Sequence, residues 1–139
     1  GSIYRNLMLY TSSNGKIVEP RYSDCIDANI VLNAYYGDIG IMAFDKPITK
    51  ITNGAFMYCN TLTDITIPES VTTIGYAAFV SCTGFTGKAV LPESLLILDE
   101  RTFDGCEKLT NISVPAKKTD YYKKRLPRRL LDKIVELKK

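Results

Sequence analysis

Four cysteines are the first candidates in this chain for catalysis, redox chemistry or metal binding. The sequence has no histidine, which removes the commonest general base and the commonest zinc ligand. No two cysteines have the Cys-x-x-Cys spacing of a thioredoxin-like redox site or a zinc ribbon; they are Cys25, Cys59, Cys82 and Cys106. A reactive thiolate also needs a base, a cation or further ligands beside it, and the sequence offers no such set. We therefore predict no catalytic residue, no cofactor and no metal site.

The spacing of three of these cysteines indicates a repeat. Cys59, Cys82 and Cys106 are separated by 23 and 24 residues, and three columns of apolar residues keep the same intervals. The columns are Phe56, Phe79 and Phe103, then Ile51, Ile74 and Leu98, then Leu62, Phe85 and Leu109. A unit this short cannot bury its own apolar face, whereas stacked units share one continuous core, as in a solenoid. We expect the thiols to pack in that core, because side chains stacked in parallel lie wider apart than the roughly 3.8 Å between Cβ atoms that a disulfide prefers.

Each unit contains the pattern of two short extended segments around a compact turn. Apolar and polar residues alternate over residues 62–67, as in a half-buried strand, and Pro68 ends this segment. Residues 71–74 form a second extended piece. The following residues 77–79 are too few for an independent helix and suit a single helical or 3-10 turn that buries Phe79.

One unit is a residue longer than its neighbours. The prolines that end the first extended segment are separated by 24 and then 23 residues; they are Pro68, Pro92 and Pro115. The cysteines show the opposite order of intervals, so the extra residue lies near Gly87 and Lys88. We expect a bulge or a turn insertion there.

The two ends of the chain differ from the middle, as the ends of a solenoid must if apolar surface and strand edges are to be covered. Asn14-Gly15 predicts a β-hairpin between two extended runs, and a second hairpin or paired strand is expected around Gly37-Asp38. At the other end, residues 116–139 hold ten Lys or Arg against three Asp or Glu, a net charge of +7, whereas residues 1–115 carry −4. Thr119 or Asp120 suits the start of one short helix, and Pro127 suits the first turn of another. Four apolar residues then share one helical face, which predicts a helical cap; they are Leu126, Leu130, Ile134 and Leu137.

The segment LTDITIPESVTTIGYAAFVSC, residues 62–82, resembles the BspA-like leucine-rich repeats, and the likeness covers residues 47–115. We predict an α/β leucine-rich-repeat solenoid, right-handed, made of short strands with short helical or 3-10 turns. Its parts are a β-hairpin cap region over residues 1–46, the repeats over 47–115 and a basic helical cap over 116–139. The resemblance implies a bacterial protein at the cell surface or secreted, with a role in adhesion or protein recognition.

The outward face of the repeat strands contains the candidate binding residues. Aligning the units places Asp64, Lys88 and Asn111 in one outward row and Thr66, Val90 and Ser113 in the next. In a solenoid the buried columns hold the scaffold, whereas such variable outward positions usually carry recognition. The alternative for any one of these residues is that its side chain is simply solvated and contacts no partner.

A second candidate surface arises where the last unit breaks the pattern. The positions of Thr72 and Thr73 are taken there by Leu96 and Ile97, so two normally solvated positions become apolar. Either the C-terminal helical cap covers them, as terminal repeats often require, or a protein partner docks on them.

Composition and charge leave three functional classes open. Hydrophobic residues make up 45% and charged residues 24%, as in soluble globular proteins, and no apolar run approaches the roughly 20 residues of a membrane span. The favoured hypothesis is a non-catalytic module that binds a protein, for example a host extracellular protein, with any membrane attachment supplied by a lipid anchor outside the given sequence. One alternative is a structural spacer that displays another part of a larger surface protein. The other is a nucleic-acid or anionic-membrane binder acting through the basic tail, which has no nucleic-acid-binding motif.

Overall fold

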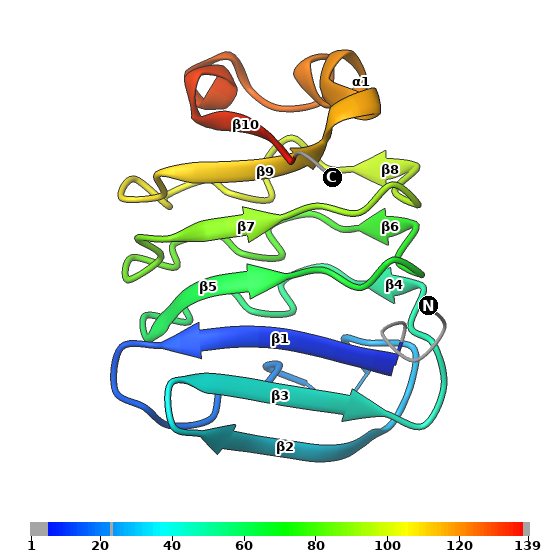
Figure 1. Cartoon of the computed structure of the whole chain (residues 1–139), viewed down its shortest axis with the longest axis vertical. Helices are drawn as coiled ribbons and strands as arrows, with labels where there is room; N and C mark the ends of the chain where they lie inside the picture. The colour runs from blue at the N-terminus through cyan, green and yellow to red at the C-terminus, as the bar shows by residue number, and fades with distance from the viewer. Residues whose placement is uncertain (1–5, 23, 138–139) are drawn as a thin grey trace.

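Two β-sheets run along the molecule in the computed structural model, which describes residues 6–22 and 24–137 (Figure 1). One sheet has seven strands in the order β10-β9-β7-β5-β1-β3-β2, and the other has three in the order β4-β6-β8. The strands are β1 (Leu7–Ser12), β2 (Ile30–Tyr36), β3 (Ile39–Phe44), β4 (Lys50–Ile51), β5 (Leu62–Thr66), β6 (Thr73–Ile74), β7 (Lys88–Val90), β8 (Ile97–Leu98), β9 (Asn111–Pro115) and β10 (Ile134–Leu137). The helical elements are η2 (Ala116–Lys118), α1 (Thr119–Lys123) and η3 (Arg128–Lys133). The fold is therefore rich in sheet and poor in helix.

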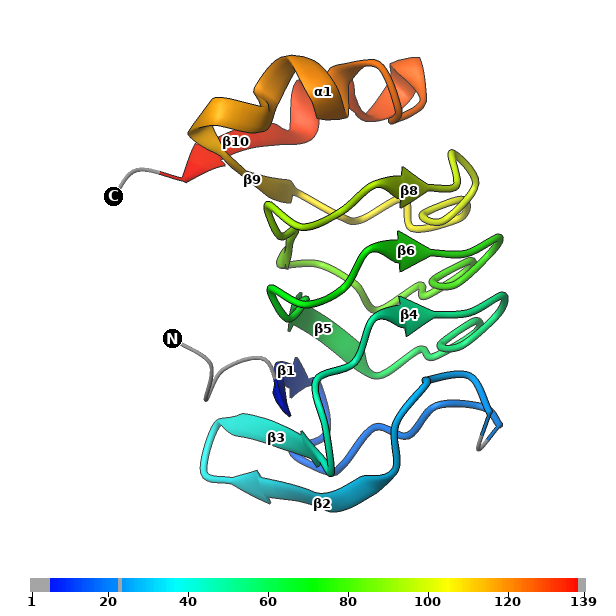
Figure 2. The same ribbon diagram turned by 90° about the vertical axis from the view of Figure 1, so that its right-hand side faces the viewer.

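The repeat units stack in parallel, as their spacing predicts. β5, β7 and β9 pair in one sheet, and β4, β6 and β8 pair in the other, so each complete unit contributes a strand to both (Figure 2). Ile65 lies beside Ala89, and Ala89 lies beside Ile112, which gives offsets of 24 and then 23 residues. The change of offset confirms an extra residue before β7, where the amide of Gly87 donates to the carbonyl of Thr63 at 3.0 Å.

The core lies between the two sheets and is built from the predicted columns. The rings of Phe56 and Phe79 stack with centroids 5.4 Å apart, and those of Phe79 and Phe103 stack at 5.7 Å. The other two apolar columns are also buried, with Ile51, Ile74, Leu62 and Phe85 fully enclosed. A ladder of stacked rings gives each unit the same apolar neighbour above and below, which is the packing that a single unit cannot supply.

The turn that carries Phe79 differs from the predicted helical or 3-10 turn. It is a series of hydrogen-bonded turns, in which the amide of Ala78 donates to Gly75 and that of Val80 donates to Ala77. Ala77 and Ser81 adopt φ values of 58° and 55°, in the left-handed region. Because residues with positive φ cannot continue a right-handed helix, the chain reverses direction within a few residues.

The first strand joins the repeats into one larger sheet. β1 pairs antiparallel with β3 on one edge and with β5 on the other. Neither edge of β1 is therefore free to pair with the residues that follow the Asn14-Gly15 turn. The first predicted hairpin is therefore wrong, although Gly15 does adopt a φ of 68° in a turn. The second is confirmed, because β2 and β3 pair antiparallel across Gly37-Asp38. The ring of Tyr10 lies against Gly40 on the neighbouring strand, where a Cβ atom would approach it to 2.3 Å.

The C-terminal segment, residues 116–137, combines short helices with a strand. Leu126 and Leu130 are buried, but Ile134 and Leu137 belong to β10, which pairs in parallel with β9. The predicted single helical face over these four residues is therefore wrong. Its apolar spacing suits a helix, but β9 would otherwise be a bare edge, and pairing with β10 satisfies its backbone groups.

Candidate protein-binding surfaces

The outward side chains of β5, β7 and β9, called the sheet face, form rows in the register that the repeat predicts. Lys88 lies beside Asn111, and Val90 lies beside both Thr66 and Ser113. Thr66 and Lys88 are exposed, whereas the other predicted residues of these rows, Asp64, Val90 and Asn111, are partly buried. Ser113 is only 2% exposed, and its hydroxyl donates to Oδ1 of Asn111 at 2.6 Å. The accessible side chains of these two rows therefore lie mainly on β5 and β7, whereas Ser113 is buried on β9 beside β10.

The sheet face continues onto strands that the sequence alone did not connect to it. Leu9 on β1 lies beside Thr66 and also beside Ile41 on β3, and Ile41 lies beside Ala34 on β2. Seven strands spaced about 4.8 Å apart give a face about 29 Å wide. Alternating residues in 7–12 and 39–44 signalled strands, but nothing local could show that β1 pairs with β5.

A hollow lies at the end of the sheet face where β5, β7 and β9 finish. It has a volume of about 520 Å³ and is lined by Glu69, Glu93, Pro115, Ala116, Lys117 and Leu137. The amide of Glu93 donates to a carboxylate oxygen of Glu69 at 3.1 Å, which ties the two units together at this rim. The hollow thus adds two glutamates and a lysine to a face that already contains Asp64 and Lys88.

Leu96 and Ile97 form a second exposed surface, at the edge of the three-stranded sheet. They are 63% and 60% exposed, so the expectation that the C-terminal helices cover them is wrong. The segment reaches this edge with the hydroxyl of Tyr121, which donates to the carbonyl oxygen of Leu96 at 2.7 Å. Ile97 stands in the outward row of Lys50 and Thr73, where it replaces polar side chains by a large apolar one.

Side chains end the backbone ladder of the three-stranded sheet in both directions. Within it, the carbonyl of Thr49 accepts the amides of Thr72 and Thr73, and the carbonyl of Thr72 accepts those of residues 96 and 97. One unit earlier, the carboxylate of Asp27 accepts the amides of Thr49 and Lys50 at 2.8 and 3.1 Å. The carboxylate of Asp27 therefore acts as the backbone carbonyl that a preceding unit would supply. The hydroxyl of Tyr121 acts as the backbone amide that a following unit would supply. Burial would raise the pKa of Asp27, but hydrogen bonds from Thr49 and Lys50 outweigh it and hold that pKa below its usual value.

Replacing Asp27 by Asn tests its role at the ladder end. A carboxyl group whose pKa is lowered by folding stabilises the fold above its unfolded pKa of about 3.9, and this contribution is lost as the pH falls through the folded pKa. We expect Asp27→Asn to lower the free energy of unfolding by about 1–2 kcal/mol at neutral pH, and the difference from wild type to shrink in acid. Urea unfolding at both pH values measures this.

The control is Asp24→Asn, which changes the charge equally at an exposed carboxylate three residues away. It should leave stability nearly unchanged at either pH. An Asp27→Asn effect that stays constant into acid would mean that the charge of Asp27 does not stabilise the ladder.

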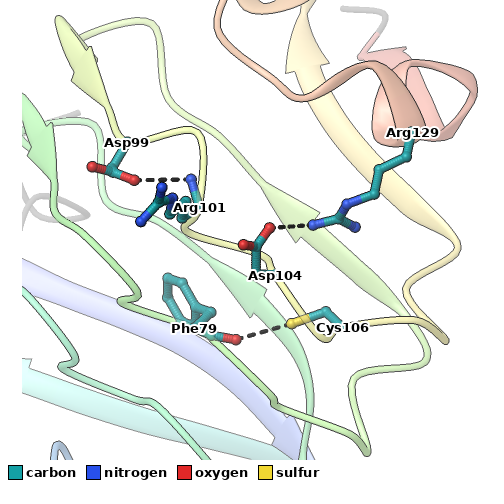
Figure 3. A network of polar contacts seen from close by, with 6 residues as sticks. All are labelled: Phe79, Asp99, Arg101, Asp104, Cys106 and Arg129. Carbon is teal, nitrogen blue, oxygen red and sulfur yellow. Dashed lines mark hydrogen bonds and ion pairs between the residues drawn. The ribbon is translucent and has the colours of Figure 1, made fainter.

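Three of the four cysteines, Cys25, Cys82 and Cys106, are buried in the core. The thiol of Cys106 donates to the carbonyl oxygen of Phe79 at 2.9 Å (Figure 3), and that of Cys82 donates to Phe56 at 3.1 Å. The neighbouring Cys106 thiol and burial raise the pKa of Cys82, so its thiol stays protonated at neutral pH. Cys59 is only partly buried, and burial raises its pKa as well. All four cysteines are free, and residues 6–22 and 24–137 contain no group of side chains that could hold a metal ion.

Several basic side chains of the C-terminal segment are held by contacts within the chain. Arg129 forms an ion pair with Asp104 of the last repeat unit (Figure 3). The guanidinium of Arg125 lies 3.4 Å from the centroid of the Tyr121 ring, and Lys118 Nζ lies 4.4 Å from it. Arg129 therefore helps to dock the segment on the repeats, while Arg125 and Lys118 lie over a ring of the segment itself. Both kinds of contact reduce what the tail offers to phosphates or bases.

Comparison with known proteins agrees with the stacked units. No curated protein and no solved structure matches the chain. Among the described residues, no helix is both long and apolar enough to cross a membrane. A family model for the BspA type leucine-rich repeat region, in six copies, matches residues 22–129. Since this match covers most of the chain and its stacked units have the expected columns, the chain belongs to the BspA type leucine-rich repeat family.

Proposed function

We propose that the chain is a non-catalytic protein-binding or adhesion module of a bacterial surface or secreted protein. Its scaffold in this proposal is a right-handed solenoid with repeats over residues 47–115, a hairpin-containing cap over 1–46 and a basic cap over 116–139. The observation that carries the proposal is the sheet face, a continuous seven-stranded surface. Domains of repeat proteins commonly present such extended surfaces to other proteins.

The composition of the sheet face supports a protein partner over a small ligand. Its central row contains Leu9, Thr66 and Val90, all at least partly accessible, with the charged Lys88 beside them. Protein interfaces combine an apolar centre with a polar rim, and the face has both. The exposed pair Leu96 and Ile97 supplies a second apolar surface on the opposite sheet.

A binding assay against purified mammalian extracellular proteins tests this function. The immobilised chain is exposed to each protein in turn, and any interaction is then measured with a variant carrying Thr66→Arg and Lys88→Glu. Both side chains are exposed, so the fold should survive. The few residues that dominate an interface cost about 2 kcal/mol or more when changed, so we expect affinity to fall at least about tenfold if these two are among them.

Lys50→Glu is the control for the Lys88→Glu part of the variant, because it reverses the same charge at an exposed strand residue of the other sheet. It should alter affinity by less than about twofold. A second variant, Ile97→Thr, restores the pattern of Thr73 and reports on the other apolar surface. Equal affinity of the Thr66/Lys88 variant and wild type, or loss of affinity only in Ile97→Thr, would reject the sheet face as the binding surface.

A further inference from the structure

β2 is the longest unpaired strand edge in the described part of the chain. It lies at one end of the seven-stranded sheet, and among residues 6–22 and 24–137 it pairs with β3 alone (Figure 1). The edge strands of the other sheet, β4 and β8, have two residues each. β10 ends the same sheet at the other side, but it is shorter and contains the exposed Glu136.

β2 lacks most of the features that usually prevent edge pairing. Natural edge strands are blunted by charged residues, proline, bulges or short length. The seven residues of β2 include no charged residue and no proline. Three large apolar side chains at the start of the strand are exposed: Ile30, Val31 and Leu32. Its pairing with β3 is irregular between Ile30 and Leu32, which leaves residues 32–36 as the regular part.

The open backbone groups of β2 can be assigned from the hairpin. Tyr36 and Ile39 face each other across the two-residue turn, and such a pair exchanges backbone hydrogen bonds. Backbone groups alternate in direction along a strand, so those of Tyr35 and Asn33 point toward the open edge. A strand added here would have to satisfy these two residues.

We propose that β2 pairs with β2 of a second copy of this chain, antiparallel and about a two-fold axis at Ala34. Asn33 of one copy then lies opposite Tyr35 of the other, so every open backbone group of residues 33–35 has a partner. Leu32 of each copy lies opposite Tyr36 of the other, and these side chains are 43% and 55% exposed in the single chain. Cross-strand pairs of an aromatic and an aliphatic residue stabilise antiparallel sheets. The irregular part at Val31 stays outside the pairing.

Charge favours this contact over one through the other end of the molecule. The C-terminal segment and β2 lie at opposite ends of the sheet (Figures 1 and 2). Residues 116–139 carry a net charge of +7, so self-association through β10 would bring two strongly basic surfaces together. Pairing through the uncharged β2 keeps them at the far ends of a continuous sheet, and two-fold contacts of this kind are the commonest among homo-oligomers.

The register can be tested with two matched variants of the full chain. Leu32→Lys with Tyr36→Lys sets like charges opposite each other across the axis, whereas Leu32→Lys with Tyr36→Glu sets opposite charges there. Sedimentation velocity over a range of concentrations measures the dimer dissociation constant, and the unfolding midpoint shows that each variant folds. We expect wild type to dimerise and the Lys/Lys variant to bind itself at least about tenfold more weakly. The Lys/Glu variant should lie between them.

Three outcomes would overturn the proposal. A wild-type chain that stays monomeric at the highest concentration reached would show that no second copy occupies the edge. A Lys/Lys variant that dimerises as tightly as wild type would place the contact elsewhere. Growth of open-ended oligomers that Val135→Lys prevents would indicate head-to-tail pairing of β2 with β10 instead.

Discussion

Phe79→Ala is expected to lower the free energy of unfolding by about 3–5 kcal/mol, the usual cost of removing a fully buried Phe. The ring is completely enclosed and stacks between Phe56 and Phe103, so its loss opens a cavity that touches three successive units. The chain can repack only partly, because the strands on either side are fixed by the ladder hydrogen bonds. Urea unfolding followed by far-ultraviolet circular dichroism measures the change.

Two further variants keep this test informative if Phe79→Ala fails to fold. Phe79→Leu retains part of the volume and should cost about 1–2 kcal/mol. Tyr76→Ala removes an exposed ring from the same turn, whose main contact is the guanidinium of Arg101 at 5.5 Å, and should cost no more than about 1 kcal/mol. A Phe79→Ala loss as small as that of Tyr76→Ala would mean that the phenylalanine column does not hold the units together.

Gly84→Ala should destabilise the protein by about 3 kcal/mol, because overpacking against a rigid neighbour forces backbone shifts. A Cβ atom at Gly84 would lie 2.0 Å from the backbone oxygen of Asn60, far inside contact distance. That oxygen belongs to the preceding unit, so the clash can be relieved only by separating two stacked units. The same unfolding experiment gives the magnitude.

Lys108 occupies the corresponding position one unit later and supplies the control. Its side chain is exposed, and Lys108→Ala should change stability by less than about 0.5 kcal/mol. If Gly84→Ala were equally harmless, the units would not approach each other as closely at this turn as the structure has them.

The repeat columns could be predicted from the sequence because stacking makes their contacts nearly local. Cys82, Phe79 and Ile74 recur at one interval, and one interval determines which residues meet in every unit. The extra residue near Gly87 was also predictable. It lengthens the interval from Pro68 to Pro92 to 24 residues, whereas the interval from Leu62 to Phe85, which ends before it, stays at 23. Such regularities depend on counting residues, not on knowing which distant segments pair.

Contacts outside the repeat could not be predicted in the same way. The Asn14-Gly15 turn is present, but β1 pairs with β3 and β5, and no local signal in Leu7–Ser12 specifies those partners. Ile134 and Leu137 fit a helical pattern, yet they form a strand because β9 offers a bare edge beside them. Local patterns restrict the conformation of a segment, whereas tertiary pairing decides between the conformations that remain.

The candidate surfaces show the same division between pattern and packing. The rows of Thr66, Val90 and Lys88 followed from the alignment of units. The near-complete burial of Ser113 did not, because it depends on the strand added after the repeat. The break at Leu96 and Ile97 was visible in the sequence, but only the structure shows that both side chains stay exposed.

Site-specific photo-cross-linking tests the central claim, that the sheet face binds a protein, most directly. A photoreactive phenylalanine analogue is placed at Lys88 on the sheet face or at the exposed Tyr58 on a turn away from it, and each chain is irradiated with the captured extracellular protein. We expect a cross-linked complex from position 88 and none from position 58. Cross-linking from position 58 alone, or no capture of any protein in the panel, would contradict it.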